Sequence, residues 1–485
     1  MEQITGREKE IKILQKLLDS NNPELLAVYG RRRVGKTYLI SRFFYGKGLY
    51  FELTGINRGS RQEQLNQFSK AMSEAFPTAG PFPSPKSWFT AFDILREQLE
   101  RHPKKSKIIL FLDEFPWLAT NRPSHLMKAF EHVWNRYFSR MPNIKVVICG
   151  SAASWMIKKV INNKGGLYGR LTQKMHLQPL TLYETELYLQ SNNVCLDRKQ
   201  ITDIYMTIGG IPKYLNFIEQ GLSSAQITYS LCFSPFGYLK TEFLQLFESL
   251  FDNHKTHMSV VRALAKKHQG LTFNELAKTI DVKSGGFLTE ILDELELSGF
   301  VQFISFFGKK KREGQYRLID EYSLFYLTWV EPNQNHPCTE DYWLRMQRSP
   351  RYLSWAGYAF ENICIKYADM VARALNITVI TESYSHWFHR PDKNKDARGA
   401  QIDLVIDRKD QTVNLCEIKF CEKEYEITKD YAAILNNRRA TFREVTKTRK
   451  SIFNTIITPF GAKQNAAYLS CVDNQVDMSA LFVKI

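Results

Sequence analysis

The 485-residue sequence predicts an α/β fold in which a doubly wound parallel sheet is followed by a helical region and by a second, smaller α/β domain. Over the first third of the chain, short apolar runs alternate with helical patterns, as in a sheet covered on both faces. Near residue 257 the pattern changes to short helices and a hairpin, and strands return after residue 350. The predicted domains are residues 1–180, 181–250, 251–331 and 350–485.

The first predicted strand, Glu24 to Gly30, runs into a glycine-rich loop and then into a helix. The loop fits G-x-x-x-x-G-K-[ST], in which backbone N–H groups and the helix N-terminus cradle phosphates. We expect Lys36 to reach the β- and γ-phosphates of ATP and Thr37 to hold Mg²⁺ through its hydroxyl. The predicted nucleotide-binding residues of this loop are Gly30, Arg31, Arg32, Arg33, Val34, Gly35, Lys36 and Thr37.

Two further apolar runs end in polar residues suited to ATP hydrolysis. Ile108 to Leu112 reads as a buried parallel strand and leads to Asp113, suited to binding Mg²⁺, and Glu114, suited to polarising the attacking water. A strand followed by an acidic helix cap is the alternative. The run from Lys145 ends at Ser151, which either contacts the γ-phosphate or attacking water or caps the next helix. Two more strands are predicted at residues 48–55 and 175–180.

A short box precedes the loop: Ile4-Thr5-Gly6-Arg7-Glu8-Lys9-Glu10. Its residues Thr5 and Glu8 have the spacing of a capping box that opens a helix. With this box, the segment from Met1 to Gly221 resembles an AAA+ ATPase of the archaeal-type, or STAND, branch, in which a hydrophobic-GRExE box precedes the P-loop. The resemblance implies that Gly6 and Arg7 contact the adenine side of the nucleotide, and that the protein can form oligomers through this domain.

Two later motifs extend the resemblance. GGLYGR, ending at Arg170, resembles the arginine segment of these ATPases, and GGIPKYL, residues 209–215, resembles their lid motif. An arginine near the γ-phosphate would stabilise charge that develops in the transition state. Arg170 would act within its own chain or on a neighbour, or it is a surface residue on a turn.

The middle of the chain has the order of a winged helix: three helices and then a hairpin. Thr272 and Glu275 form a capping box for the second helix, and the third is expected near residues 285–299. The hairpin tip carries four basic residues that could meet a DNA backbone, namely Lys309, Lys310, Lys311 and Arg312. A solvated basic turn, or a module that binds only protein, is the alternative.

The C-terminal region places three charged residues within apolar strands: Asp403, Glu417 and Lys419. Charges in such strands are costly unless they are paired or bind a metal. With Glu361 on an upstream helix, the series resembles the PD-(D/E)XK nucleases of the restriction-endonuclease-like fold, although Ile402 stands where the strict motif has proline. The resemblance implies that Asp403 and Glu417 bind Mg²⁺ and that Lys419 orients or deprotonates water.

Composition points to a cytoplasmic protein with a polyanionic partner. The excess of 66 Lys and Arg over 50 Asp and Glu gives +16, and residues 436–451 carry six basic residues against one acid. No apolar run is long enough to span a membrane, and the N-terminus lacks a signal-peptide core. The sequence therefore predicts an ATP-hydrolysing AAA+ protein coupled to a Mg²⁺-dependent DNA nuclease. The alternative is a non-cleaving nucleotide switch whose C-terminal domain binds nucleic acid or a protein.

Overall fold

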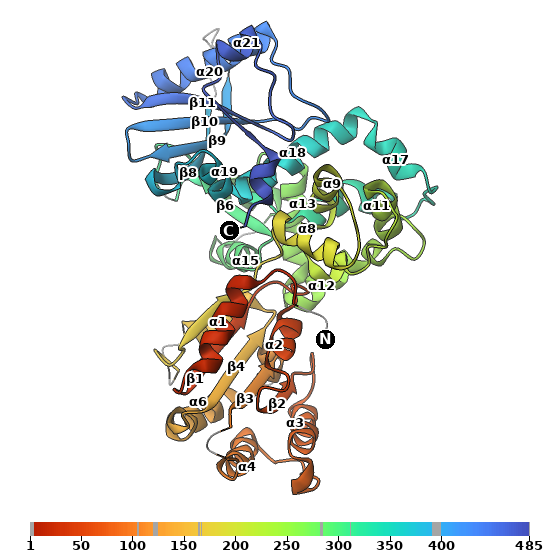
Figure 1. The fold of residues 1–485 in the computed structure, drawn as a ribbon, viewed down its shortest axis with the longest axis vertical. Helices are drawn as coiled ribbons and strands as arrows, with labels where there is room; N and C mark the ends of the chain where they lie inside the picture. The colour runs from red at the N-terminus through yellow and green to blue at the C-terminus, as the bar shows by residue number, and fades with distance from the viewer. Residues whose placement is uncertain are drawn as a thin grey trace. The chain divides into compact units, whose positions relative to one another are not determined.

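The computed structural model describes residues 4–103, 106–119, 125–162, 165, 167–281, 285–310, 312–389 and 399–484. The chain forms two compact units (Figure 1): residues 1–179 with 250–252, and residues 180–249 with 253–485. The predicted domains of residues 181–250, 251–331 and 350–485 thus fall almost wholly within the second unit. In the part of the chain described, no helix is both long enough and apolar enough to cross a bilayer.

The first unit is built on a five-stranded parallel sheet in the order β2-β3-β4-β1-β5. Its strands are β1 (Glu24–Tyr29), β2 (Leu49–Thr54), β3 (Ile108–Asp113), β4 (Ile144–Gly150) and β5 (Gln173–His176). Every residue of β3 and β4 is buried, as expected for central strands covered on both faces. The predicted parallel sheet is confirmed, and the parallel strands bring the loops that follow them to one edge.

Helices of the first unit pack on this sheet, with Trp88, Phe92 and Phe130 in the shared core. The helices are α1 (Glu8–Asp19), α2 (Lys36–Phe44), α3 (Arg61–Ala75), α4 (Trp88–Glu100), α5 (Phe115–Leu118), α6 (Leu126–Arg136) and α7 (Ala153–Trp155). Two 3₁₀ turns, η1 (Pro77–Ala79) and η2 (Phe138–Arg140), and the wider π-helical η3 (Met156–Ile161) complete the helical segments described for this unit.

The predicted capping box at the start of the chain is wrong. Helix α1 begins at Glu8, and its N-cap is Arg7, whose side chain makes no capping hydrogen bond. Gly6 and Arg7 have φ of 68° and 65°, so the backbone turns through the left-handed region immediately before the helix. That turn moves the cap position from Thr5 to Arg7.

The second unit opens with helices and an aromatic core. Its helices are α8 (Leu182–Ser191), α9 (Arg198–Ile208), α10 (Pro212–Leu215), α11 (Ser224–Cys232), η4 (Tyr238–Lys240) and α12 (Glu242–Leu250). Further along the chain lie α16 (Glu321–Phe325), the π-helical η5 (Tyr326–Val330), η6 (Glu331–Asn333) and α17 (Tyr342–Gln347). Trp329, Trp343 and Trp355 are buried together, with ring centroids 5.2 to 6.3 Å apart.

Three helices and a hairpin follow α12 in the predicted order. They are α13 (His254–Lys266), α14 (Phe273–Thr279), α15 (Gly285–Leu297) and the antiparallel strands β6 (Val301–Ser305) and β7 (Gly314–Leu318). The capping box of Thr272 and Glu275 is confirmed at the start of α14.

A second five-stranded sheet, in the order β12-β11-β10-β9-β8, forms the C-terminal region. Strands β8, β9 and β10 are antiparallel neighbours, whereas β10, β11 and β12 run parallel. The strands are β8 (Thr381–His389), β9 (Ala400–Arg408), β10 (Thr412–Ile418), β11 (Ser451–Thr458) and β12 (Asn474–Asp477). The helices are α18 (Pro350–Lys366), α19 (Ala368–Ala374), η7 (Thr378–Ile380), α20 (Lys429–Thr446), α21 (Ala466–Leu469) and η8 (Met478–Phe482).

The β6–β7 hairpin docks on β8, an edge strand of this second sheet. The Phe307 backbone N–H donates to the His386 carbonyl over 2.9 Å, next to a parallel bridge between Phe306 and His386. Phe306 packs against Phe388 and Phe307 against Phe442, with ring centroids 5.1 and 5.0 Å apart. The hairpin therefore covers part of an otherwise open sheet edge.

This docking bears on the predicted DNA-contacting tip. Lys309, Lys310 and Arg312 are exposed, and Lys311 lies outside the described residues. The base of the tip is held against β8, so the hairpin packs on the second sheet whether or not its basic residues meet DNA.

A close backbone approach at Gly210 gives a stability prediction. The Leu180 N–H donates to the Gly210 carbonyl over 2.7 Å, and a Cβ at Gly210 would lie 1.8 Å from the Leu180 carbonyl oxygen. We expect Gly210→Ala to lower the free energy of unfolding by about 1–3 kcal/mol through overpacking. Gly357→Ala, within α18 and with open space at its Cβ, should instead stabilise by about 1 kcal/mol. Denaturant unfolding of both variants tests the contrast, which equal midpoints would contradict.

Candidate functional site

The loop between β1 and α2 has the geometry of a phosphate cradle. Gly30 has φ of 147°, and a Cβ there would lie 2.2 Å from the Leu177 carbonyl oxygen, so this approach requires glycine. Gly35, with φ of 89°, is the N-cap of α2. The loop thus opens onto a helix N-terminus, where unpaired N–H groups favour an anion.

Lys36 lies folded over this loop. Its Nζ donates to the carbonyl oxygens of Gly30 and Arg31, both over 3.0 Å, and the residue is 5% exposed. The ammonium group is therefore held where the predicted phosphates would lie. A bound phosphate would replace two neutral acceptors by charged ones, which make stronger hydrogen bonds.

Thr37 and Asp113 meet beside the loop, as predicted for a Mg²⁺ site. Thr37 Oγ1 donates to Asp113 Oδ2 over 2.8 Å, and Asp113 Oδ1 is buried with no hydrogen-bond partner in the part of the chain described. Burial, followed by the charge of Glu114, raises the pKa of Asp113. A hydroxyl and an underused carboxylate fit Mg²⁺, which takes few protein ligands and keeps phosphate and water oxygens.

Glu114 and Ser151 come together from the ends of β3 and β4. Glu114 Oε2 accepts hydrogen bonds from Ser151 N over 3.0 Å and from Ser151 Oγ over 2.8 Å. Glu114 has φ of 44°, an uncommon conformation for a residue with a side chain. The alternative role of Ser151 as a helix cap is wrong, because Ala152 is the N-cap of α7 and gives no side-chain cap.

Arg7 connects the N-terminal box to the loop. Its Nη2 donates to the Val34 carbonyl over 3.0 Å, its Nη1 lies 3.7 Å from Glu10 Oε1, and the residue is buried. Within the loop, the Arg32 guanidinium lies 5.6 Å from the Trp117 ring centroid. The structure therefore gives Arg7 a bracing role, while contact of Gly6 and Arg7 with adenine stays a prediction.

Arg170 is not brought to this site. It is exposed on a turn before β5, and the nearby Thr172 N–H donates to the Leu25 carbonyl over 3.0 Å, at the start of β1. The P-loop follows the other end of β1, five residues beyond Leu25. This geometry disfavours a role for Arg170 within its own chain and leaves the neighbour and surface alternatives as predictions.

A second cluster of charges lies between β9, β10 and α20. Lys419 Nζ lies 2.7 Å from Glu417 Oε1, and the Arg438 guanidinium and Tyr431 hydroxyl also donate to this carboxylate. Burial would raise the pKa of Glu417, but Lys419 and Arg438 outweigh it and lower the pKa. Asp403 Oδ2 accepts from the Ile418 N–H over 3.0 Å, which ties β9 to the same region. The predicted Asp403, Glu417 and Lys419 are therefore neighbours.

Glu361 completes the cluster but is engaged elsewhere. Its Oε1 accepts from Arg317 Nη1 over 2.7 Å, and both side chains are buried. Burial, then the charges of Glu417 and Glu361, raises the pKa of Asp403, as expected where carboxylates gather. Even so, no group of three or more Asp, Glu, His or Cys within the described ranges is placed to hold a metal ion.

Several basic residues of the segment 436–451 form ion pairs within the protein. Arg438 bonds to Glu417, Arg439 lies 3.4 Å from Asp473, and Lys450 pairs with Asp407. The exposed remainder is Arg443, Lys447 and Arg449. The predicted phosphate-contacting surface is therefore smaller than the sequence indicated.

Sequence reasoning missed the residues that pair with Glu417 and Glu361 in the C-terminal cluster. Tyr431 and Arg438 are seven residues apart on α20, a helical spacing that could have placed them on one face. Arg317 gave no signal, because it lies 44 residues from Glu361 in a strand of the hairpin.

Comparison with known proteins supports the nucleotide site. Residues 4–218 match the ATPase_2 model, an ATPase domain predominantly from Archaea. These residues form an ATPase domain. The matched range contains the P-loop, Asp113, Glu114 and Ser151, and it ends well before the C-terminal cluster.

Relatives are similar over different lengths. An uncharacterized protein of Methanocaldococcus jannaschii is 24% identical over 431 residues, which cover 88% of this chain and 89% of that protein. An uncharacterized ATP-binding protein of the same organism is 44% identical over 42 residues, 9% of this chain and 71% of its own length. Among solved structures, a Walker-type ATPase of Pyrococcus abyssi has a TM-score of 0.48 and 18% identity, covering 67% of this chain and 96% of its own.

The raised pKa of Asp113 predicts a pH-dependent Mg²⁺ requirement. A carboxyl whose pKa is raised takes up its proton at a higher pH, so Mg²⁺ should strengthen ATP binding less at about pH 5 than at about pH 8. Calorimetric titration with and without Mg²⁺ measures this gain. Because ATP itself titrates, Asp113→Asn is the reference: its gain should be small at both pH values. An equal pH dependence in both proteins would contradict the prediction.

Proposed function

We propose that the loop between β1 and α2 binds and hydrolyses Mg²⁺–ATP, with Glu114 as the residue that orients the attacking water. The observation that carries this proposal is that two acidic residues at the end of β3 contact polar residues at the start of α2 and after β4. Thr37 donates to Asp113, and the next residue, Glu114, accepts two hydrogen bonds from Ser151. A nucleotide pocket and a catalytic carboxylate at one sheet edge suit hydrolysis as well as binding.

Each side chain then has a separate task. Lys36 transfers its hydrogen bonds from the Gly30 and Arg31 carbonyls to the β- and γ-phosphates. Thr37 and Asp113 would hold Mg²⁺, which neutralises phosphate charge. Ser151 fixes one oxygen of Glu114, leaving the other to accept a hydrogen bond from water and align it with the γ-phosphorus.

Substitutions at Lys36 and Glu114 should separate binding from hydrolysis. Glu114→Gln keeps the size of the side chain but cannot act as a base, so we expect ATP affinity within about threefold of wild type and kcat lowered by about 10²–10⁴. Lys36→Ala should lose ATP binding, because the phosphates lose their cation. Calorimetry and phosphate release measure the two steps. Hydrolysis by Glu114→Gln at the wild-type rate would remove Glu114 from the mechanism.

A second function is favoured by the C-terminal cluster. We propose that residues 350–485 are a nuclease-like domain, joined through a winged-helix module to the ATPase, with DNA as the substrate. The neighbouring Asp403, Glu417 and Lys419 support it, as does a sheet whose β8, β9 and β10 are antiparallel and whose β11 returns parallel to β10 after α20. In the conformation described, the internal ion pairs of Glu361 and Glu417 do not fit a bound metal.

Plasmid cleavage tests this proposal. We expect the protein to nick or cut DNA with ATP and Mn²⁺, and Glu417→Ala to abolish cutting because Lys419 and Arg438 lose their shared carboxylate. Glu444→Ala, which removes an exposed carboxylate from α20, is the matched control and should cut at the wild-type rate. Silence of the wild type and both variants, with ATP hydrolysis intact, would favour the non-cleaving nucleotide switch.

A further inference from the structure

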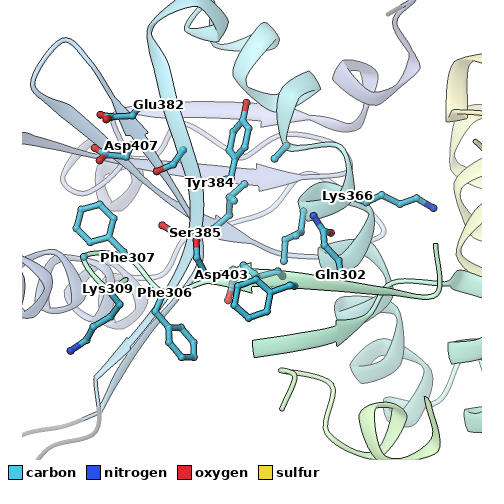
Figure 2. Close-up of a pocket in the computed structure, with 18 of the residues that line it drawn as sticks. Gln302, Phe306, Phe307, Lys309, Lys366, Glu382, Tyr384, Ser385, Asp403 and Asp407 are labelled. Atoms are coloured by element: carbon cyan, nitrogen blue, oxygen red, sulfur yellow. The ribbon is translucent and has the colours of Figure 1, made fainter. Parts of the chain in front are cut away.

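A cavity of about 740 Å³ in the second unit leads to Asp403. Strand β6 and the start of β8 form two of its walls, Figure 2 shows Asp403 and Ser385 near its middle, and Gln302 of β6 also lines it. Ser385 is 3% exposed, and its Oγ has no hydrogen-bond partner among the described residues; the same is true of Gln302 Oε1. Polar atoms left unpaired around a cavity indicate a place for solvent or ligand.

Arg317, in β7 of the hairpin whose other strand lines this cavity, is buried with only part of its hydrogen-bonding capacity used. Its side chain is 1% exposed, and Nη1 donates to Glu361 Oε1 over 2.7 Å. Its Nε and Nη2 are buried without a partner in the described part of the chain. A guanidinium has five donor hydrogens. Burial removes water from all of them at Arg317, and the side-chain hydrogen bond that replaces it is the one to Glu361.

The cations around the carboxylate cluster differ in origin. Lys419 directly follows β10 and Arg438 belongs to α20, both in the C-terminal region itself. Arg317 comes from β7 of the docked hairpin, which the Phe307–His386 hydrogen bond holds against β8. Hence the charge on Glu361 is balanced by a residue of the docked hairpin, not by a residue of the second sheet or of α20.

We propose that Arg317 is an internal cation that occupies the position of a divalent metal ion at Glu361 and keeps the C-terminal site closed while the hairpin is docked. The proposal rests on the nuclease-like function proposed above and adds its regulation. Undocking the hairpin withdraws Arg317, exposes Glu361 beside Asp403 and leaves carboxylate oxygens free for a hard cation.

Two further contacts show what undocking must break. Asn362 Nδ2 donates to the Leu318 carbonyl over 2.9 Å, and Lys366 Nζ donates to Glu321 Oε1 over 2.8 Å. Leu318 ends β7 and Glu321 begins α16, so both contacts join α18, the helix that carries Glu361, to the chain that follows Arg317. The closed state is thus held by three side chains of α18, those of Glu361, Asn362 and Lys366.

Mn²⁺ binding without nucleotide tests the proposal directly. Removing the charge at Arg317 should open Glu361 to metal, so Arg317→Gln should bind one more Mn²⁺ per chain, or bind it about tenfold more tightly, than wild type by electron paramagnetic resonance. This gain in Mn²⁺ binding should vanish in the double variant Arg317→Gln, Asp403→Asn. Because the double variant leaves the P-loop unchanged, the loss would locate the extra Mn²⁺ in the C-terminal cluster. Arg345→Gln, which breaks an exposed pair with Asp341, is the matched control and should bind as wild type does.

A measurement on the wild type covers the case in which Arg317→Gln does not fold. A high Mn²⁺ concentration should compete with Arg317 for Glu361 and undock the hairpin. Amide hydrogen exchange over residues 301–318 should then become faster in the wild type but not in Asp403→Asn. Arg317→Gln that folds without gaining Mn²⁺ overturns the proposal, as does unchanged exchange in the wild type. The proposal is also overturned if the wild-type protein already binds Mn²⁺ at Asp403 as tightly as Arg317→Gln does. The nuclease function is tested separately, by plasmid cleavage.

Discussion

The placement of buried charge is the constraint on which both units depend. A charged group removed from water needs a charged or hydrogen-bonding partner, and the identity of that partner determines what the site can bind. In the first unit, Lys36 donates to two backbone carbonyls, and Asp113 accepts from the Thr37 hydroxyl. These neutral groups are weak partners for full charges, so phosphates and a metal ion would improve on them. The nucleotide site is therefore built to be completed from outside.

The C-terminal cluster solves the same problem in the opposite way. Glu417 accepts from Lys419, Arg438 and Tyr431, and Glu361 accepts from Arg317. Here the partners are already ionic, so a cation from solution must displace a residue before it can bind. Nearby acids with opposite pKa shifts follow from this arrangement: cations lower the pKa of Glu417, while Asp403, beside other carboxylates, has its pKa raised.

The sequence could predict what depends on local patterns. Apolar runs that end in a glycine or an acid located β1 and β3 and placed Lys36, Thr37, Asp113 and Glu114 at their ends. It failed where the backbone left the expected region: the left-handed turn at Gly6 and Arg7 moved the start of α1 away from Thr5. Strand alternation brought Asp403 near Glu417, but no pattern could pair Glu361 with Arg317, because that contact depends on how a hairpin docks.

The docked hairpin also gives a physical reason why closure would be reversible. Phe306 and Phe307 pack apolar rings across the junction, a gain that favours docking, while Arg317 is desolvated with two donor atoms unpaired, a cost that opposes it. Lys419 follows β10 directly and Arg438 lies on α20, so hairpin undocking leaves both beside Glu417, whereas Arg317 leaves with its hairpin. A junction held by opposed terms responds to modest changes in binding energy. DNA phosphates at the exposed Lys309, Lys310 and Arg312 would supply such a change on the hairpin itself.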